Sequence, residues 1–317
     1  MRTVLCVVLG LTLAACAADN TAESAPIIDM HLHPTPWTRY DGMRDTSDFT
    51  RAWRATADTM DHFNIVLSLG SGPMDVMEHW HRLAPTRVVV GALFPCDGPL
   101  APNGGRQCYA TGDSMPALDW LRTEIEAGRI GFLGEITTQY VGLPPADPIM
   151  EPYYALAEEL DVPVAIHMGN GPAGAPYEDG PCGPDPCARN YRAAYSNALL
   201  LEDVLARHPR LRVWVMHSGW PLLEEMIQML YMYPQIYTDI AILGRSGVMP
   251  RPAFHDYICS LVRNGFGNRI MHGTDANPAG YREAIEALES APCLSAEQKR
   301  DILYNNAARF LRLEGAR

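Results

Sequence analysis

The chain has 317 residues, of which 47% are hydrophobic and 20% charged, and its formal net charge is −12 at pH 7. The length exceeds that of a typical domain but suits a single α/β barrel with a large buried core. The negative charge argues against nucleic acid or an anionic surface as a partner, so the expected partner is a small-molecule substrate.

The N-terminal segment is expected to lie outside the folded domain. Arg2 precedes an apolar stretch that ends in Leu13-Ala14-Ala15-Cys16. This pattern resembles a bacterial lipoprotein signal, which predicts a signal peptide over 1–15, lipidation of Cys16 and a polar tether over 16–25. The apolar stretch is too short to span a bilayer, so the expected product is an exported protein held to the cell envelope by its lipid alone. An ordinary signal peptide with an incidental cysteine is the alternative.

From residue 26 onward, short apolar runs alternate with longer amphipathic stretches. Eight such units, with no linker and no internal repeat, predict one (β/α)8 TIM barrel over 26–317. An extra C-terminal helix over 295–313 is expected to begin with a capping box of Ser295 and Gln298. The expected strands cover residues 27–33, 65–69, 87–94, 131–136, 162–168, 212–217, 236–240 and 269–274. The expected helices cover residues 47–62, 74–83, 114–127, 149–160, 191–208, 221–231, 251–263 and 279–289.

Six cysteines follow Cys16, and an even number in an exported chain predicts disulfides. A zinc knuckle is the alternative, but no pair has the Cys-x-x-Cys spacing of such sites. The loops that follow the third and fifth strands each carry two of the cysteines and are expected at the rim of the active face. Proximity in the sequence suggests the pairs Cys96–Cys108, Cys182–Cys187 and Cys259–Cys293.

The first strand carries the sequence Asp29-Met30-His31-Leu32-His33. On a strand, residues i and i+2 point to the same side, so His31 and His33 direct two imidazoles at one point. At the carboxyl end of a buried strand this pair indicates a metal site, with two core histidines as the alternative. His79 and His81 have the same spacing but lie in an expected helix, where residues two apart do not share a metal.

Four further strand ends carry a residue able to bind a metal or to activate water. They are Glu135 in Gly134-Glu135-Ile136, His167, His217, and Asp275 in Gly273-Thr274-Asp275. Barrel enzymes place their chemistry at this face, so the six residues together predict a metal-dependent catalytic site.

This pattern resembles the amidohydrolase superfamily, in its branch of amidohydrolase-related hydrolases and decarboxylases. The sequences Asn277-Pro278 and Ile302–Phe310 add to the likeness, which extends from about residue 27 to 313. The resemblance implies a divalent metal held by His31, His33 and Asp275. It also implies that His167 and His217 hold a second metal, or that one is a ligand and the other an acid or base.

The fourth strand departs from the pattern of many relatives, in which a carbamylated lysine bridges two metals. Here the only lysine is Lys299, near the C-terminus, and Glu135 stands at the bridging position. A glutamate has two oxygens and can bridge two cations without carbon dioxide, and support of a neighbouring histidine is the alternative. Zinc suits this nitrogen and oxygen ligand set, with manganese or iron as alternatives.

The expected reaction is hydrolysis of an amide, ester or lactone, with Asp275 taking a proton from the activated water and His217 or His167 polarising the carbonyl. A metal-dependent decarboxylase and a non-catalytic binding lipoprotein are the alternatives. Side chains on the loops that follow the strands are candidates for substrate binding, because arginine pairs with carboxylate or phosphate. These candidates are Trp37, Arg39, Tyr40, Arg189 and Arg245.

Overall fold

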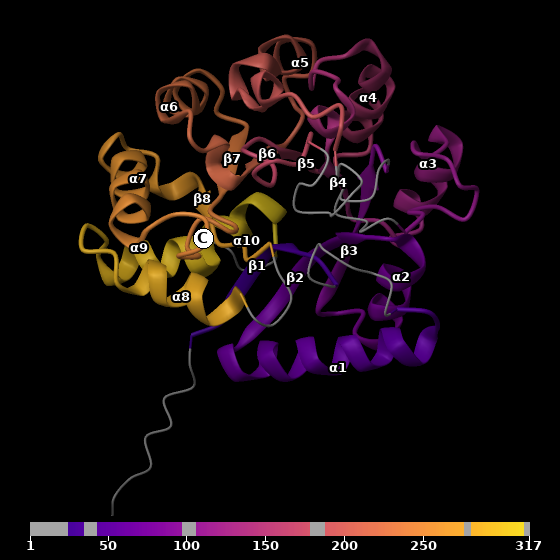
Figure 1. Cartoon of the computed structure of the whole chain (residues 1–317), viewed down its shortest axis with the longest axis horizontal. Helices are drawn as coiled ribbons and strands as arrows, with labels where there is room; N and C mark the ends of the chain where they lie inside the picture. Colours follow the sequence, from indigo (N-terminus) through magenta and orange to yellow (C-terminus); the bar gives the residue numbers. More distant parts are fainter. Residues whose placement is uncertain (1–24, 35–42, 97–105, 178–187, 276–279, 314–317) are drawn as a thin grey trace, which may run out of the picture.

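The computed structural model of the chain describes residues 25–34, 43–96, 106–177, 188–275 and 280–313. Eight parallel strands form one sheet in the order β1 to β8, and the helices lie outside it (Figure 1). The N–H of Met30 in β1 donates to the carbonyl oxygen of His272, just after β8, over 2.9 Å, which brings the last strand against the first. The predicted single-domain (β/α)8 barrel is confirmed.

The strands are short and apolar, as expected for a parallel sheet that is covered on both sides. Val88–Phe94 and Val213–Met216 illustrate this composition, because β-branched and aromatic residues dominate both. The strands are β1 (Ile27–Leu32), β2 (Ile65–Gly72), β3 (Val88–Phe94), β4 (Phe132–Ile136), β5 (Val164–His167), β6 (Val213–Met216), β7 (Ile236–Asp239) and β8 (Ile270–Met271).

The helices follow the strands in alternation, and several have the expected caps. Asp45 accepts from the N–H groups of Ser47 and Asp48 at the start of the first helix, and Ser295 forms the predicted capping box with Gln298. The α-helices are α1 (Thr46–Phe63), α2 (Met74–Leu83), α3 (Leu118–Glu126), α4 (Glu151–Glu159), α5 (Glu202–Arg207), α6 (Leu223–Met232), α7 (Arg251–Arg263), α8 (Tyr281–Glu289), α9 (Ala296–Arg300) and α10 (Asn306–Leu311).

Three expected elements differ from the structure. The helix expected over 191–208 is two 3-10 turns followed by α5, because the Asn197 side chain accepts from the N–H of Leu199 and interrupts the helical pattern. The strand expected over 269–274 ends at Met271. Beyond it the N–H of His272 donates to the carbonyl oxygen of Ile302, and the N–H of Thr274 donates to the Asp29 carboxylate as well as to the carbonyl oxygen of His31, so the regular ladder stops. The C-terminal helix contains a π turn between α9 and α10.

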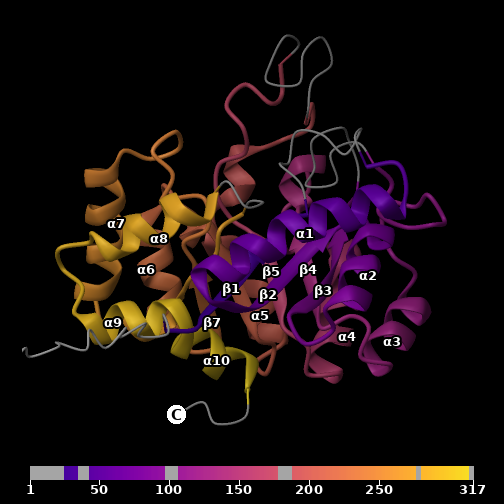
Figure 2. The same ribbon diagram turned by 90° about the horizontal axis from the view of Figure 1, so that it is seen from below.

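Helix α10 closes one end of the barrel. Its residues Ala307, Ala308 and Phe310 form a buried cluster with Phe132 and Trp214 from inside the sheet. Figure 2 shows α10 at the lower side of the strands, with the other helices around them. This end is filled with apolar side chains, so polar chemistry is confined to the opposite end, where the strands have their carboxyl termini.

Two of the three predicted disulfides are present, Cys96–Cys108 and Cys259–Cys293. The pair Cys182–Cys187, the lipidation site Cys16 and the segments 1–15 and 16–24 lie outside the described residues. Among the helices that the structure does describe, none has the length and apolar character needed to cross a membrane.

Candidate metal centre

Four donor atoms meet at the carboxyl end of the barrel. They are Nε2 of His31, Nε2 of His33, Oε2 of Glu135 and Oδ1 of Asp275. The two imidazole nitrogens lie 3.2 Å apart. Asp275 lies 3.3 and 3.2 Å from them, and Glu135 lies 3.5 and 3.1 Å away.

These separations fit a single cation. In a tetrahedral site with metal–ligand bonds of about 2.1 Å, neighbouring donor atoms are about 3.4 Å apart. Oε2 of Glu135 is also buried and makes no hydrogen bond within the described residues, although buried carboxylate oxygens normally have a partner. The side chains of His31, His33 and Glu135 are at most 1% exposed, and a metal ion is the kind of ligand that such a group of donors binds.

In three of the four histidine rings, the nitrogen that faces away from the cluster lies near an acceptor that fixes the ring orientation. Nδ1 of His33 lies 2.8 Å from the carbonyl oxygen of Ser71, and Nδ1 of His217 lies 3.2 Å from that of Ala241. Nδ1 of His31 lies 3.3 Å from a carboxylate oxygen of Asp239. An acceptor at Nδ1 places the proton there and leaves the Nε2 lone pair directed into the cluster, as metal-binding histidines require.

Glu135 also contacts the other two histidines. Its Oε1 lies 2.5 Å from Nδ1 of His167 and 3.8 Å from Nε2 of His217, and those two nitrogens are 3.2 Å apart. One carboxylate therefore faces a pair of histidines with each of its oxygens. The structure brings together all six residues that the sequence indicated.

Burial and charge set the protonation of this cluster. Burial lowers the pKa of His33, but its close contacts with the carboxylates of Asp275 and Glu135 outweigh it and raise that pKa to about 9. Burial likewise lowers the pKa of His31, but the charge of Asp275 contributes to a net rise well above the ordinary value. Burial raises the pKa of Glu135, yet hydrogen bonds with histidines, His167 foremost, hold it well below its usual range. The ionised carboxylates therefore favour positive charge here, and a divalent cation supplies it in place of protons.

Asp239, at the end of β7, contacts the cluster although it is not among the residues that the sequence indicated. Its Oδ1 accepts from the N–H of His217 over 2.8 Å and from that of Ala241 over 3.1 Å, while Oδ2 faces His31. His217 and the next residue, Ser218, have left-handed backbone angles, with φ of 57° and 49°. Such angles are unfavourable for residues with a side chain, and the Asp239 carboxylate holds them in place. Its position at a strand end was the available signal.

Asp29 on β1 holds the backbone next to Asp275, as Asp239 holds the backbone of His217. Its carboxylate accepts from the N–H and the hydroxyl of Thr274, over 3.0 and 2.7 Å. The next residue, Asp275, has a φ of 52°, and its N–H donates to the carbonyl oxygen of His31 over 2.8 Å. These bonds fix the Asp275 carboxylate beside the first-strand histidines.

None of the predicted substrate-binding residues has a described contact with the candidate metal centre. Trp37, Arg39 and Tyr40 lie outside the described residues. Arg189 is exposed in the turn after the long loop. Arg245 follows β7 and is half-buried. Hydrogen bonds with Ser246 lower the pKa of Glu283 on α8, and the charge of Arg245 adds to this effect. Their roles stay predictions.

The second histidine pair on α2 lies apart from the cluster. Nε2 of His79 lies 2.8 Å from the hydroxyl of Thr50, and Nδ1 of His81 lies 2.8 Å from the carbonyl oxygen of Val88. These are contacts between α2 and its neighbours, which supports the structural interpretation of this pair.

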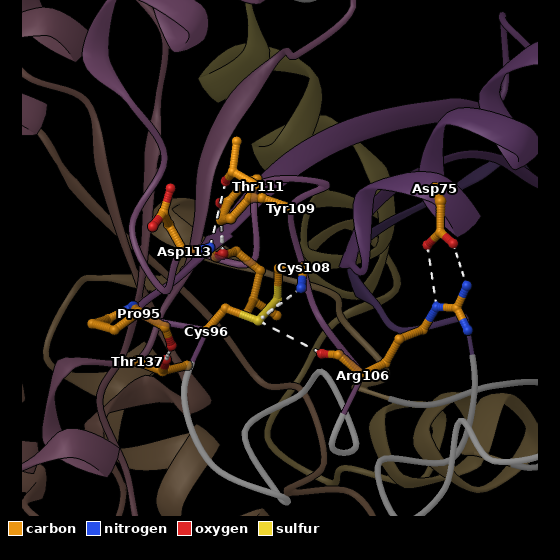
Figure 3. Close-up of a disulfide and its surroundings, with 10 residues drawn as sticks. Asp75, Pro95, Cys96, Arg106, Cys108, Tyr109, Thr111, Asp113 and Thr137 are labelled. Carbon is orange, nitrogen blue, oxygen red and sulfur yellow. Dashed lines mark hydrogen bonds and ion pairs between the residues drawn. A yellow bond between two sulfur atoms is a disulfide. The ribbon is translucent and has the colours of Figure 1, made fainter.

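The loop of the Cys96–Cys108 disulfide lines a different cavity. Arg106 pairs with Asp75 on one side of the disulfide, and Thr137 donates to the carbonyl oxygen of Pro95 on the other (Figure 3). A cavity of about 610 Å³ lies between this segment and the starts of α2 and α3. None of the six cluster residues lines it, so it is separate from the candidate metal centre.

Comparison with known proteins gives one family match. A profile of the amidohydrolase family matches residues 28–313. No curated protein sequence matches the chain.

Several solved structures share the fold. An uncharacterised TIM-barrel protein from Bordetella bronchiseptica is 17% identical over 90% of this chain and 98% of its own, with a TM-score of 0.60. A dihydroxybenzoic acid decarboxylase from a Polaromonas species, solved with manganese and an inhibitor, is 15% identical over 92% and 97%, with a TM-score of 0.57. A probable 2-pyrone-4,6-dicarboxylic acid hydrolase from Acinetobacter baumannii is 12% identical over 90% and 99%, also with a TM-score of 0.57. At these identities the likeness concerns the fold.

Proposed function

This chain belongs to the amidohydrolase family, and from that premise we propose that it is a metal-dependent hydrolase acting on an amide, ester or lactone bond of a small molecule. The observation that carries the proposal is the position of Glu135, whose two oxygens face two different pairs of histidines. A carboxylate between two pairs of nitrogen donors suits two cations, and two-cation centres are typical of hydrolysis by activated water.

The residues divide into two sets of ligands. His31, His33 and Asp275 would hold one cation, His167 and His217 the other, and Glu135 would bridge them. A divalent metal bound there supplies Lewis acidity and lowers the pKa of water to about 7. Zinc suits the donors, and manganese or iron suit them as well.

Asp275 is the candidate proton carrier. Its side chain is 12% exposed, whereas those of His31 and Glu135 are at most 1% exposed, so Asp275 is the carboxylate of the cluster that water and substrate reach most readily. The pKa of Asp275 is lowered, because the charge of His31 and a hydrogen bond with His33 outweigh the effect of burial. An ionised carboxylate at that point accepts a proton from water and returns it to the leaving group. His217 is then the candidate to polarise the scissile carbonyl.

A metal-dependent decarboxylase is the second candidate. Four donors already surround one point, His31, His33, Glu135 and Asp275, and they suffice for a single cation. In that case His167 and His217 are free for acid–base work on a bound acid.

The number of bound metal ions distinguishes the proposed hydrolase from the decarboxylase. We would measure it by elemental analysis of the purified chain and of Glu135→Ala, with the exposed Glu126→Ala as a matched control. Two equivalents that fall to one or none in Glu135→Ala, with no change in Glu126→Ala, are expected, together with turnover in a panel of amides, esters and lactones. One equivalent, with release of carbon dioxide from aromatic acids, would establish the decarboxylase instead. Metal-dependent binding of a ligand without turnover would favour a binding protein.

We also propose that the protein is exported and anchored through lipid on Cys16. The N-terminal sequence and the two disulfides support this, because disulfides persist in oxidising compartments. The intact mass of the protein from membranes tests it. The expected mass corresponds to a chain that begins at Cys16 and carries lipid, and a chain that begins elsewhere without lipid would contradict the proposal.

A further inference from the structure

A tyrosine lies against the metal centre and has no role so far. Tyr140 follows β4 in a short 3-10 turn, five residues after Glu135. Its ring meets that of His167 edge to face, with the centroids 5.2 Å apart, and meets Tyr191 in the same way at 5.1 Å. The Tyr140 ring thus lies between His167 of the candidate centre and Tyr191.

The Tyr140 hydroxyl makes no hydrogen bond to any residue within the described ranges. Tyr191 beside it is fully engaged, since its hydroxyl contacts the carbonyl oxygen of Gly169, the N–H of Gly171 and the hydroxyl of Ser196 within 3.0 Å. Buried tyrosine hydroxyls usually have a partner, and Tyr140 is only 8% exposed. A donor at the edge of a site without a protein partner is available to a ligand.

The Tyr140 hydroxyl is a neutral hydrogen-bond donor at neutral pH, because a tyrosine keeps its proton up to a pH of about 10. Such a group stabilises negative charge that develops on a substrate oxygen, and it does so without adding a charge of its own.

We propose that the Tyr140 hydroxyl donates a hydrogen bond to an oxygen of the substrate at the reacting group, and thereby selects substrates that present an oxyanion-forming carbonyl on the His167 side of the centre. This rests on the proposed function, because it places a reacting group over the metal ligands. The contact between the Tyr140 ring and His167 fixes the orientation of the Tyr140 side chain, and the Tyr140 hydroxyl then contacts the substrate.

The test uses the full-length protein loaded with zinc and a tetrahedral anion, methylphosphonate, as a probe of oxyanion recognition. Its affinity would be measured by calorimetry for the wild type, Tyr140→Phe and Tyr154→Phe. Tyr140→Phe keeps the ring and removes only a hydroxyl that makes no hydrogen bond to the described residues. Tyr154→Phe removes a buried hydroxyl that bonds the carbonyl oxygen of Pro145 over 2.6 Å. Zinc content and thermal unfolding would be measured on all three.

Tyr140→Phe is expected to bind methylphosphonate about 10-fold or more weakly than the wild type, as the loss of a hydrogen bond to a charged group implies. Its zinc content and unfolding temperature should stay unchanged, and Tyr154→Phe should keep full affinity. Equal affinities of wild type and Tyr140→Phe, or no binding to the zinc-loaded wild type, would overturn the proposal. If the wild type binds zinc and methylphosphonate but hydrolyses no amide, ester or lactone, the proposed hydrolysis fails, while the affinity ratio still decides the role of Tyr140.

Discussion

Asp239 holds two parts of the candidate centre at once, the ring of His31 and the backbone of His217. An asparagine has nearly the same shape but no charge, so it orients His31 less strongly and makes its Nε2 a weaker ligand. Replacement of groups that orient metal ligands typically reduces metal affinity about 10–100-fold.

We therefore expect Asp239→Asn to lower zinc affinity by that amount in a competition with a chelator. The exposed Asp58→Asn on α1 changes the same charge far from the site and should leave the affinity unchanged. Equal affinities for Asp239→Asn and the wild type would show that this carboxylate does not support the ligands.

Asp275→Asn separates metal binding from proton transfer. The amide oxygen still offers one donor to a cation, but the side chain no longer accepts a proton. We expect the variant to retain metal and to lose turnover by about 10²–10⁴-fold, the usual contribution of a general base. Metal content and kcat on the same preparation measure both effects, and unimpaired turnover would refute the assigned role.

The cluster residues were predictable because each of them occupies the end of a predicted strand. Asp239 occupies the same kind of position on β7, but the sequence does not reveal that an aspartate there turns toward His31. Tyr140 was harder to predict, since it lies in a turn beyond β4. Its contact with His167 depends on how two loops pack, and no periodicity in the sequence encodes that contact.

At the level of the elements, β4 places Glu135 through the glycine before it. Gly134 has a φ of 150°, and a Cβ there would lie 2.5 Å from the Cβ of Ala165 on β5. The close approach of β4 to β5 at this point carries Glu135 toward His167. A side chain at Gly134 would force the two strands apart.

Gly134→Ala is expected to lower the free energy of unfolding by about 2–4 kcal/mol, from backbone strain and overpacking together. Gly247→Ala is the matched control, since a Cβ at Gly247 meets nothing within 4 Å. Urea unfolding of both variants measures the difference. A Gly134→Ala protein as stable as Gly247→Ala would show that the strands separate without strain.

The two described disulfides close loops of different length, with separations of 12 residues for Cys96–Cys108 and 34 for Cys259–Cys293. The entropy that a disulfide removes from the unfolded chain grows with loop length. Replacing both cysteines of a pair by serine should therefore destabilise the protein by about 3 kcal/mol for the short loop and about 1 kcal/mol more for the long one. Chemical unfolding of the two double variants tests the order, and the reverse order would contradict it.

The strands and most helices followed from the sequence because apolar runs and helical periodicity fix them locally. The segment expected as a helix over 191–208 did not follow. The Asn197 side chain competes for the N–H of Leu199, and the hydroxyl of Tyr191 binds Gly169 and Gly171. The first contact is a local side-chain bond that hydrophobic periodicity does not register, and the second joins residues about 20 positions apart. Together they outweighed the helical pattern.

For the whole molecule, carboxylates whose pKa is lowered in the folded state make stability depend on pH. Glu158 is an example on α4. Burial alone raises its pKa, but the N–H of Arg210 and the ring of His208 outweigh this and lower it below the ordinary 4.5. A carboxylate with a lowered pKa contributes stability above its unfolded value, and this contribution is lost as pH falls from about 4.5 through the folded-state pKa.

Glu158→Gln should accordingly be less stable than the wild type at pH 7, and the difference should shrink as the pH falls well below 4.5. Urea unfolding at pH 7 and at acid pH measures this. A difference that persists undiminished in acid would mean that Glu158 acts through its shape rather than its charge.

The candidate centre combines residues of the first and last strands, since His31 lies in β1, His33 directly follows it, and Asp275 comes shortly after β8. The last strand is only two residues long, and bonds from Met30 to His272 and from Asp275 to His31 join it to the first. During synthesis the first histidines leave the ribosome long before their partner does. The site can therefore assemble only once nearly the whole protein has been made. A cation bound there would hold the first strand against the end of the last one and so stabilise the closed barrel.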